Sequence, residues 1–423
     1  MVGGGIFAVL GLTIDLSHGA APLSFCLAGI IALITAYSYV KLSLRYPSEG
    51  GTIEFIVQAF GNGLFSSIIN NLLLLSYVIM LALYAYAFGS YGATLFKDNA
   101  PWLHNLLSSS VIVIFVLVNI LGAFLTGRAE DVMVFVKLII LLAFSAVGVM
   151  SIQWTHMEPH SWMPLSSVAA GGFMIFLAYE GFELIANTAR DVREPQKNLP
   201  RAYYASVIFV ILLYIVISAV AVGNLSLAEA KIAQDYVLAK AAEPIFGHTG
   251  FLFISIAALL STASAINATI YGSGRISYIV AKLGELPVEF ETKIRHGYEG
   301  MVIIGVLAVI FTTLFDLNNI SVTGSIGFLT VFALVNFANF RLYLQTGSSR
   351  FLPAAGAVLC AGAAVMLIGY NINHSPDSLY STLIVLLIVL VFSYLYNHLK
   401  GNKLAVYIDK ELEREERLLK ELL

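Results

Sequence analysis

Apolar segments long enough to cross a lipid bilayer recur along the whole 423-residue sequence. A helix that crosses the hydrocarbon core, which is about 30 Å thick, needs about 20 predominantly apolar residues. The pattern therefore predicts an all-α polytopic membrane protein. We place the spans at residues 22–45, 64–95, 107–127, 128–153, 166–190, 201–223, 249–282, 300–317, 322–344, 351–371 and 378–399, with a shorter element at 3–14.

The composition excludes several other classes of protein. Hydrophobic residues make up 59% of the chain and charged residues only 12%, whereas soluble domains carry roughly 25% charged residues. The net charge of −3 provides no basic surface for nucleic acid. Cys26 and Cys360 both lie in apolar segments, which indicates buried thiols and not a disulfide framework.

Basic residues orient the predicted spans. Lys97, Lys231 and Lys240 fall in one alternating set of loops. All other Lys and Arg residues except Lys137 fall in the opposite loops or in the tail at 400–423. Because cytoplasmic loops carry the excess of Lys and Arg, we expect a multi-pass protein of the plasma membrane with a cytoplasmic C-terminus. The tail itself predicts a charged, solvated helix.

Lys137 is the one basic residue near the middle of a predicted span. It follows Arg128 by nine residues, which places it roughly 13 Å along the helix and near the middle of the membrane. A charged amine there costs from about 2.5 to more than 10 kcal/mol. The residue must therefore face the protein interior, find a partner or lose its proton. We interpret it as a candidate proton carrier, with a structural role beside helix carbonyls as the alternative.

Glycine interrupts two of the predicted membrane elements. The first element contains Gly3–Gly5, where each glycine costs about 1 kcal/mol relative to alanine and lets a ligand approach the backbone. The sixth element carries Glu180, Gly181 and Glu183 at membrane depth. Matching interruptions in two halves of a chain indicate an inverted-repeat transporter with its site near the membrane midplane. Close helix packing through small residues is the alternative.

Two broken helices suit a zwitterion. The start of a half-helix presents free N–H groups and a positive dipole end, which favour a carboxylate. The end of a half-helix presents free carbonyl groups, which favour an ammonium group. The sequence therefore predicts an amino acid as the ligand.

Four motifs support this interpretation. They are Gly3-Gly4-Gly5-Ile6-Phe7 and residues 38–52, 179–202 and 264–287. These motifs resemble the first helix, the link between the second and third helices, the sixth helix with its following loop, and the eighth helix of the amino acid–polyamine–organocation superfamily. The resemblance covers nearly the whole chain. Within the superfamily, the chain most resembles archaeal proton-coupled amino acid transporters of broad specificity.

The resemblance implies a fold like that of the sodium-coupled leucine transporter, a 5+5 inverted repeat followed by two helices, with about 12 membrane elements. The first repeat then covers residues 1–153, the second 166–344, the two further helices 351–399 and the tail 400–423. Family members have half a helix before the glycine motif, whereas here Met1 lies two residues before Gly3. We therefore expect the first helix to be truncated in this sequence.

The resemblance also implies a division of roles. Lys137 stands where sodium-coupled relatives bind sodium, so we expect its amine to replace that ion, with the proton as coupling ion and no metal or other cofactor. The substrate carboxylate is expected at the N–H groups of the first break, and the ammonium group at the carbonyls of the second. The predicted proton-coupling residues are Lys137 and Glu183, and the predicted substrate-binding residues are Gly3, Gly4, Gly5, Ile6, Phe176, Leu177, Tyr179 and Gly181.

The leading functional hypothesis is a secondary active transporter that moves neutral amino acids with protons by alternating access. An amino acid or polyamine exchanger is the first alternative, and an amino acid receptor that does not transport is the second. No nucleophile–base pair and no metal-ligand spacing suggests an enzyme. The expected partners are a small amino acid and the lipid bilayer, not nucleic acid. The sequence leaves the oligomeric state and the choice among amino acids open.

Overall fold

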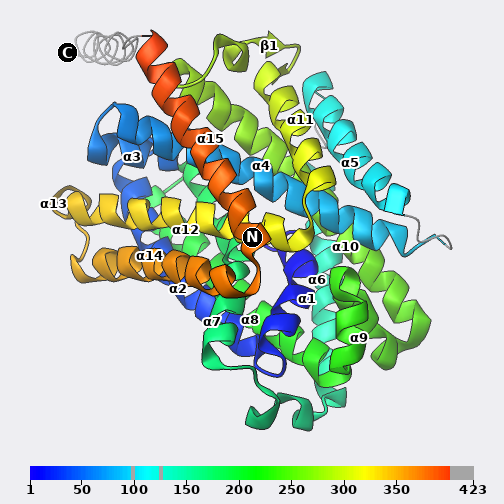
Figure 1. Ribbon diagram of the computed structural model, residues 1–423. Helices are drawn as coiled ribbons and strands as arrows, with labels where there is room; N and C mark the ends of the chain where they lie inside the picture. Colours follow the sequence, from blue (N-terminus) through cyan, green and yellow to red (C-terminus); the bar gives the residue numbers. More distant parts are fainter. Residues whose placement is uncertain (97–100, 123–126, 401–423) are drawn as a thin grey trace.

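The computed structural model describes residues 1–96, 101–122 and 127–400 and is helical almost throughout this part of the chain (Figure 1). The α-helices are α1 (Gly5–Ser17), α2 (Ala21–Arg45), α3 (Thr52–Phe60), α4 (Leu64–Ala93), α5 (Pro101–Leu121), α6 (Gly127–Gly148), α7 (Leu165–Met174), α8 (Pro195–Asn224), α9 (Leu227–Ile232), α10 (Val237–Lys282), α11 (Glu299–Leu314), α12 (Leu317–Arg341), α13 (Tyr343–Thr346), α14 (Phe351–His374) and α15 (Pro376–Lys400).

Short 3-10 helices and one small hairpin complete the described secondary structure. The hairpin joins β1 (Lys293–Ile294) and β2 (Gly297–Tyr298) in antiparallel register. The 3-10 helices are η1 (Val149–Ser151), η2 (Trp154–Met157), η3 (Pro159–Ser161), η4 (Phe176–Asp191), η5 (Gln234–Tyr236) and η6 (Val288–Glu291).

Ten helical segments of the described chain are long and apolar enough to cross a membrane. One of them combines α7 with η4, and another combines η5 with α10. The two shorter apolar helices are α1 and α11. Each predicted span overlaps one of these helices, and residues 123–126 of the span at 107–127 lie outside the described residues. The prediction of an all-α polytopic membrane protein is therefore confirmed. The inverted repeat and its boundaries at 153, 166, 344 and 351 stay a prediction, and the tail at 400–423 lies, apart from its first residue, outside the described residues.

Two features of the helices differ from the predicted spans. The short helix α3 follows Gly51, whose backbone has a φ of +46° and whose position leaves no room for a side chain beside Asn187. An apolar window does not detect a helix of this length. Helix α10 begins well before the predicted span and bends at Gly247, where φ is 65° and ψ is −163°.

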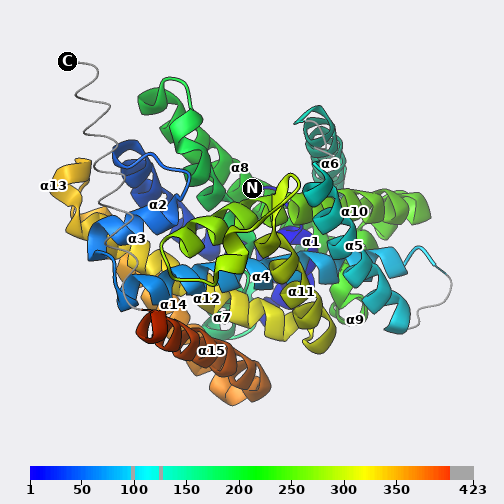
Figure 2. The ribbon, with the colours of Figure 1, turned by 90° about the horizontal axis from the view of Figure 1, so that it is seen from above.

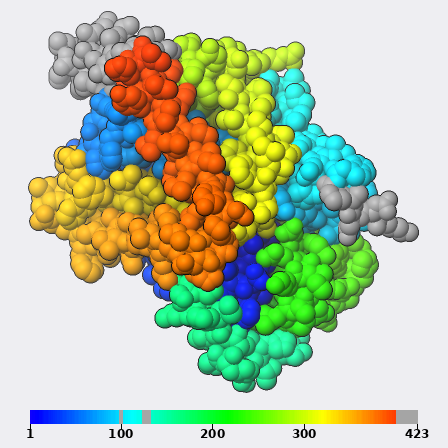
Figure 3. All heavy atoms as spheres, viewed as in Figure 1, coloured from blue at the N-terminus to red at the C-terminus, as the bar shows by residue number. Residues whose placement is uncertain are grey.

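Helix α1 lies at the centre of the molecule and is buried by its neighbours. Ile6, Phe7, Ala8 and Val9 are all 0% exposed. Helices from both halves of the chain pack against it, among them α2, α4, α7 and α10. Beyond them, α2 packs against α8, and α12 packs on α14. Seen from above, α15 and α6 lie on opposite sides of this assembly (Figure 2). In the space-filling view, α15 crosses the face of the molecule as an orange-red ridge (Figure 3).

Polar side chains hold several of these helices together. Asn336 on α12 accepts a hydrogen bond from Ser38 on α2 at 2.7 Å and donates to Thr35 at 3.0 Å. All three residues are 0% exposed. Because lipid offers no competing hydrogen bonds, side-chain bonds of this kind fix how membrane helices pack.

Candidate functional site

The predicted interruption in the first element is present. Helix α1 begins at Gly5, and the residues before it are not helical. The first intrahelical hydrogen bond runs from the Ala8 N–H to the Gly4 carbonyl at 3.0 Å, and no side chain in the described part of the chain caps this end of the helix. The N–H groups of Gly5, Ile6 and Phe7 therefore have no intrahelical acceptors. They form a positive end of the helix dipole inside the protein.

The sixth element is also interrupted, but the interruption lies at Ile175, ahead of the predicted stretch around Gly181, which is part of the 3-10 helix η4. Helix α7 ends at Met174, and the chain continues from Phe176 as the 3-10 helix η4. Ser325 on α12 bridges the break: its hydroxyl donates to the Met174 carbonyl at 2.5 Å and accepts from the Leu177 N–H at 3.4 Å. A single hydroxyl thus satisfies two backbone groups that the break releases, which is how broken helices persist at membrane depth.

The two breaks touch each other. A Cβ added to Gly5 would lie 2.9 Å from both Cα and Cβ of Ala178 in η4. A Cβ on Gly4 would lie 2.6 Å from the Tyr84 ring. On a third side, the Ser261 hydroxyl of α10 donates to the Gly3 carbonyl at 2.9 Å. The glycines of the first element therefore let two interrupted helices meet backbone to backbone.

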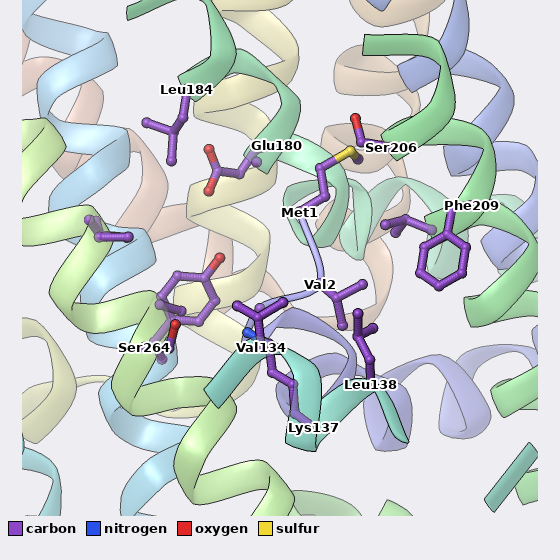
Figure 4. A pocket seen from close by; sticks show the side chains of 17 residues that line it. Met1, Val2, Val134, Lys137, Leu138, Glu180, Leu184, Ser206, Phe209 and Ser264 are labelled. Carbon is purple, nitrogen blue, oxygen red and sulfur yellow. The ribbon is translucent and has the colours of Figure 1, made fainter. Parts of the chain in front are cut away.

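A cavity of about 260 Å³ adjoins the two breaks, between α4, α6, α8, α10 and η4 (Figure 4). Apolar side chains such as Leu184 and Phe209 form part of its wall. The polar and glycine residues of the lining are Gly3, Tyr84, Lys137, Glu180, Gly181, Ser206, Ser264 and Thr269.

Lys137 extends from α6 into this cavity, toward the first residues of the chain (Figure 4). It is only 3% exposed, whereas Val132, Phe135 and Ile139 on the same helix are 49–67% exposed. The helix thus turns its apolar face outward and its amine inward. This orientation follows from the cost of a charged group in hydrocarbon.

Glu180 enters the same cavity from η4 (Figure 4). It is 2% exposed, its Oε2 atom has no hydrogen-bond partner among the described residues, and the Tyr84 hydroxyl lies within hydrogen-bonding reach of the carboxyl group. The cavity is therefore lined by one carboxyl group, that of Glu180, and by two amino groups, those of Lys137 and of the Met1 N-terminus. Sequence reasoning assigned no role to Glu180, although its position at membrane depth was the available signal.

Glu183, the second predicted proton-coupling residue, lies elsewhere. It is 0% exposed and is not among the residues that line the cavity. Its Oε1 atom accepts a hydrogen bond from Thr52 at 2.8 Å, and the Thr52 hydroxyl lies 2.8 Å from that of Tyr39. Lys137 and Glu180 therefore line the same cavity, whereas Glu183 does not line it.

The predicted substrate residues surround the contact between the breaks. Gly3 and Gly181 line the cavity, while Gly4, Gly5, Ile6, Phe176, Leu177 and Tyr179 are buried.

Side chains of the second break point away from the cavity. Tyr179 donates to the Phe25 carbonyl on α2 at 3.0 Å. The Phe176 ring packs edge-on against Phe332, with 5.7 Å between ring centroids. These residues consequently offer a ligand their backbone carbonyls and not their side chains.

Sequence reasoning missed two tyrosines. The Tyr84 ring on α4 packs directly against Gly4. Tyr214 on α8 is buried, and its hydroxyl lies beside the backbone amides of Gly3 and Ile6. The Tyr214 oxygen thus lies where the substrate carboxylate is expected. With 21 tyrosines in the chain, residue type alone gave no signal for either.

Comparison of the sequence with known proteins shows which family the chain belongs to. A family model described as amino acid permease matches residues 1–393. An uncharacterized protein of Methanocaldococcus jannaschii is 33% identical over 401 residues, which cover 94% of this chain and 92% of the relative. The inner membrane transport protein YbaT of Escherichia coli is 34% identical, covering 87% and 85% of the two chains. The branched-chain amino acid permease BcaP of Bacillus subtilis is 23% identical, covering 96% and 91%.

Proposed function

Because this chain belongs to the amino acid permease family, we propose that it carries neutral amino acids across the plasma membrane together with protons. The family and the named transporters among its relatives indicate an amino acid transporter and not an enzyme. The neutral substrate, the proton and the membrane in which it works are our proposal, as is the cytoplasmic C-terminus.

The contact between the two breaks is the observation that carries the proposal. Gly5 packs directly on the Cα atom and the methyl group of Ala178, so the free N–H groups of α1 and the backbone of η4 lie close together. A carboxylate suits the positive start of α1, and an ammonium group suits carbonyl groups. In this arrangement the substrate carboxylate displaces the Tyr214 hydroxyl from the Ile6 amide.

Lys137 and Glu180 are the residues that we assign to proton coupling. Both lie in the cavity next to the substrate region, where burial disfavours a charged amine and a charged carboxylate alike. A protonated Lys137 stabilises the contact between α6 and the first residues of the chain. Loss of its proton weakens that contact and favours a conformation open to the other side of the membrane. Glu183 stays a predicted contributor through Thr52 and Tyr39.

Uptake into proteoliposomes tests this proposal. We expect purified protein to accumulate labelled L-alanine when the pH is lower outside than inside, and to reach only equilibration without a gradient. Accumulation that is indifferent to the pH gradient contradicts proton coupling. Uptake only into vesicles preloaded with an amino acid supports an exchanger instead, and binding without any uptake supports a receptor.

A further inference from the structure

A second cavity lies at the opposite end of α1 from the first break. It has a volume of about 560 Å³, within the range of small-molecule binding sites. The end of α1, η5, the start of α12 and the end of α14 surround it. Figure 3 shows the dark-blue N-terminal segment at the surface where green, blue-green and orange segments of the chain meet.

The cavity lies at the membrane face opposite the basic loops. Asp316, which lines it, caps the start of α12, whereas Arg341 occupies the last turn of the same helix. Leu12 on α1 and Met174 at the end of α7 form part of its wall. The cavity therefore leads from the outer face toward the second break, if the basic loops are cytoplasmic as we propose.

Carboxylate groups give the cavity its charge. Asp15, Asp235 and Asp316 line it, and its described lining contains no Lys or Arg. Asp235 and Asp316 lie close enough to repel each other electrostatically. The Tyr86 hydroxyl donates to Asp235 at 3.4 Å, and one oxygen of Asp316 accepts the Asn319 N–H at 2.7 Å. Neither partner neutralises a negative charge.

Asn371 provides a second and independent observation. It lines the same cavity and is 1% exposed. Its amide nitrogen donates to the Leu367 carbonyl at 2.9 Å, but its Oδ1 atom has no hydrogen-bond partner among the described residues. A buried carbonyl oxygen without a donor is unfavourable. A ligand that brings N–H donors into this cavity would satisfy it.

We propose that this outer cavity is a separate binding site for an organic cation that carries primary ammonium groups. Such a group donates three hydrogen bonds and accepts none, which suits the carboxylates and the Asn371 oxygen. A zwitterionic amino acid suits the cavity less well, because its carboxylate would meet three others. A metal ion is disfavoured, because no three His, Cys, Asp or Glu side chains of the described chain are arranged to hold one.

If the protein transports amino acids as proposed, a cation bound in this cavity would occupy the route from outside to the breaks. Only this role of the site rests on the proposed function. Its existence is tested by binding to the purified full-length protein, with 1,4-diaminobutane as the probe in titration calorimetry. We expect saturable binding that excess L-alanine does not displace. Displacement by L-alanine would instead place the probe at the central site and overturn the proposal.

Conservative variants locate the binding. In Asp235→Asn combined with Asp316→Asn, the acceptors for Tyr86 and Asn319 are kept while the charges are removed, and we expect the dissociation constant to rise at least tenfold. Asn371→Leu should raise it severalfold. Asp377→Asn, an exposed position outside this cavity, is the matched control and should change it less than twofold. Unchanged affinity in the double variant, or no binding by the wild-type protein, refutes the site.

Uptake of labelled L-alanine, measured separately, distinguishes this result from failure of the proposed function. Loss of alanine transport in the wild-type protein would remove the proposed function and leave the calorimetric result standing. Intact transport together with absent diamine binding would remove only the outer site.

Discussion

Replacing Gly5 with alanine tests whether the two breaks must touch. The added Cβ would lie 2.9 Å from the Cα and Cβ atoms of Ala178, closer than nonbonded carbon atoms approach, and the first of these is a backbone atom that no rotamer change can move. Adding a methyl group to a packed interior costs about 1–3 kcal/mol. That range corresponds to about 5- to 150-fold in the population of the arrangement with the breaks in contact.

Gly272→Ala is the matched control for this variant. Its Cβ would meet Leu184 at 3.5 Å, an ordinary contact distance. Gly272 lies inside α10, where alanine gains up to about 1 kcal/mol of helix propensity, whereas Gly5 is the first residue of α1 and gains less. Slower uptake by Gly5→Ala than by Gly272→Ala therefore reports the steric effect and also this smaller difference in propensity.

The assay is the initial rate of labelled L-alanine uptake, with the melting temperature in detergent as a check on folding. We expect Gly5→Ala to slow uptake about 5- to 150-fold relative to Gly272→Ala, while the variant still purifies as a folded protein. Equal uptake by the two variants would show that the contact between Gly5 and Ala178 has no part in transport, and the reasoning would fail.

Three further predictions concern other buried polar groups. Lys137→Ala should abolish uptake driven by the pH gradient yet leave the protein folded, and gradient-driven uptake by this variant would remove Lys137 from the mechanism. Burial raises the pKa of Glu285 from its ordinary value of 4.5 to about 7, so the folded protein holds a proton that the unfolded chain releases, and stability should fall as the pH rises from about 4.5 to about 7. In thermal unfolding at pH 5 and pH 8, Glu285→Gln should lose this part of the pH dependence, whereas the exposed Glu289→Gln should keep it. Asn336→Ala leaves Ser38 without its acceptor and should cost about 1–3 kcal/mol, so a melting temperature equal to that of the wild type would count against the buried network.

The fold class and the break before α1 followed from the sequence because they depend on local properties. Long apolar runs show where helices cross the membrane, and three consecutive glycines before Ile6 show where a helix cannot be regular. Even the inward orientation of Lys137 follows from the cost of its charge in lipid. Each of these inferences requires only residues that are neighbours in the chain.

The partners of these residues depend on tertiary contacts that no local pattern encodes. Glu180 and Glu183 are three residues apart, yet one lines the cavity with Lys137 and the other binds Thr52. Ser325, which bridges the second break, is 148 residues away from Leu177. The helix α3 was missed for a different reason, because its nine residues are too few for a search based on spanning length.

The position of a bound amino acid tests the central claim most directly. In a structure determined with substrate, we expect the carboxylate within hydrogen-bonding distance of the N–H groups of Gly5 and Ile6. The ammonium group should meet backbone carbonyls at the start of η4. A substrate bound away from both ends, with the two breaks still packed against each other, would contradict the account.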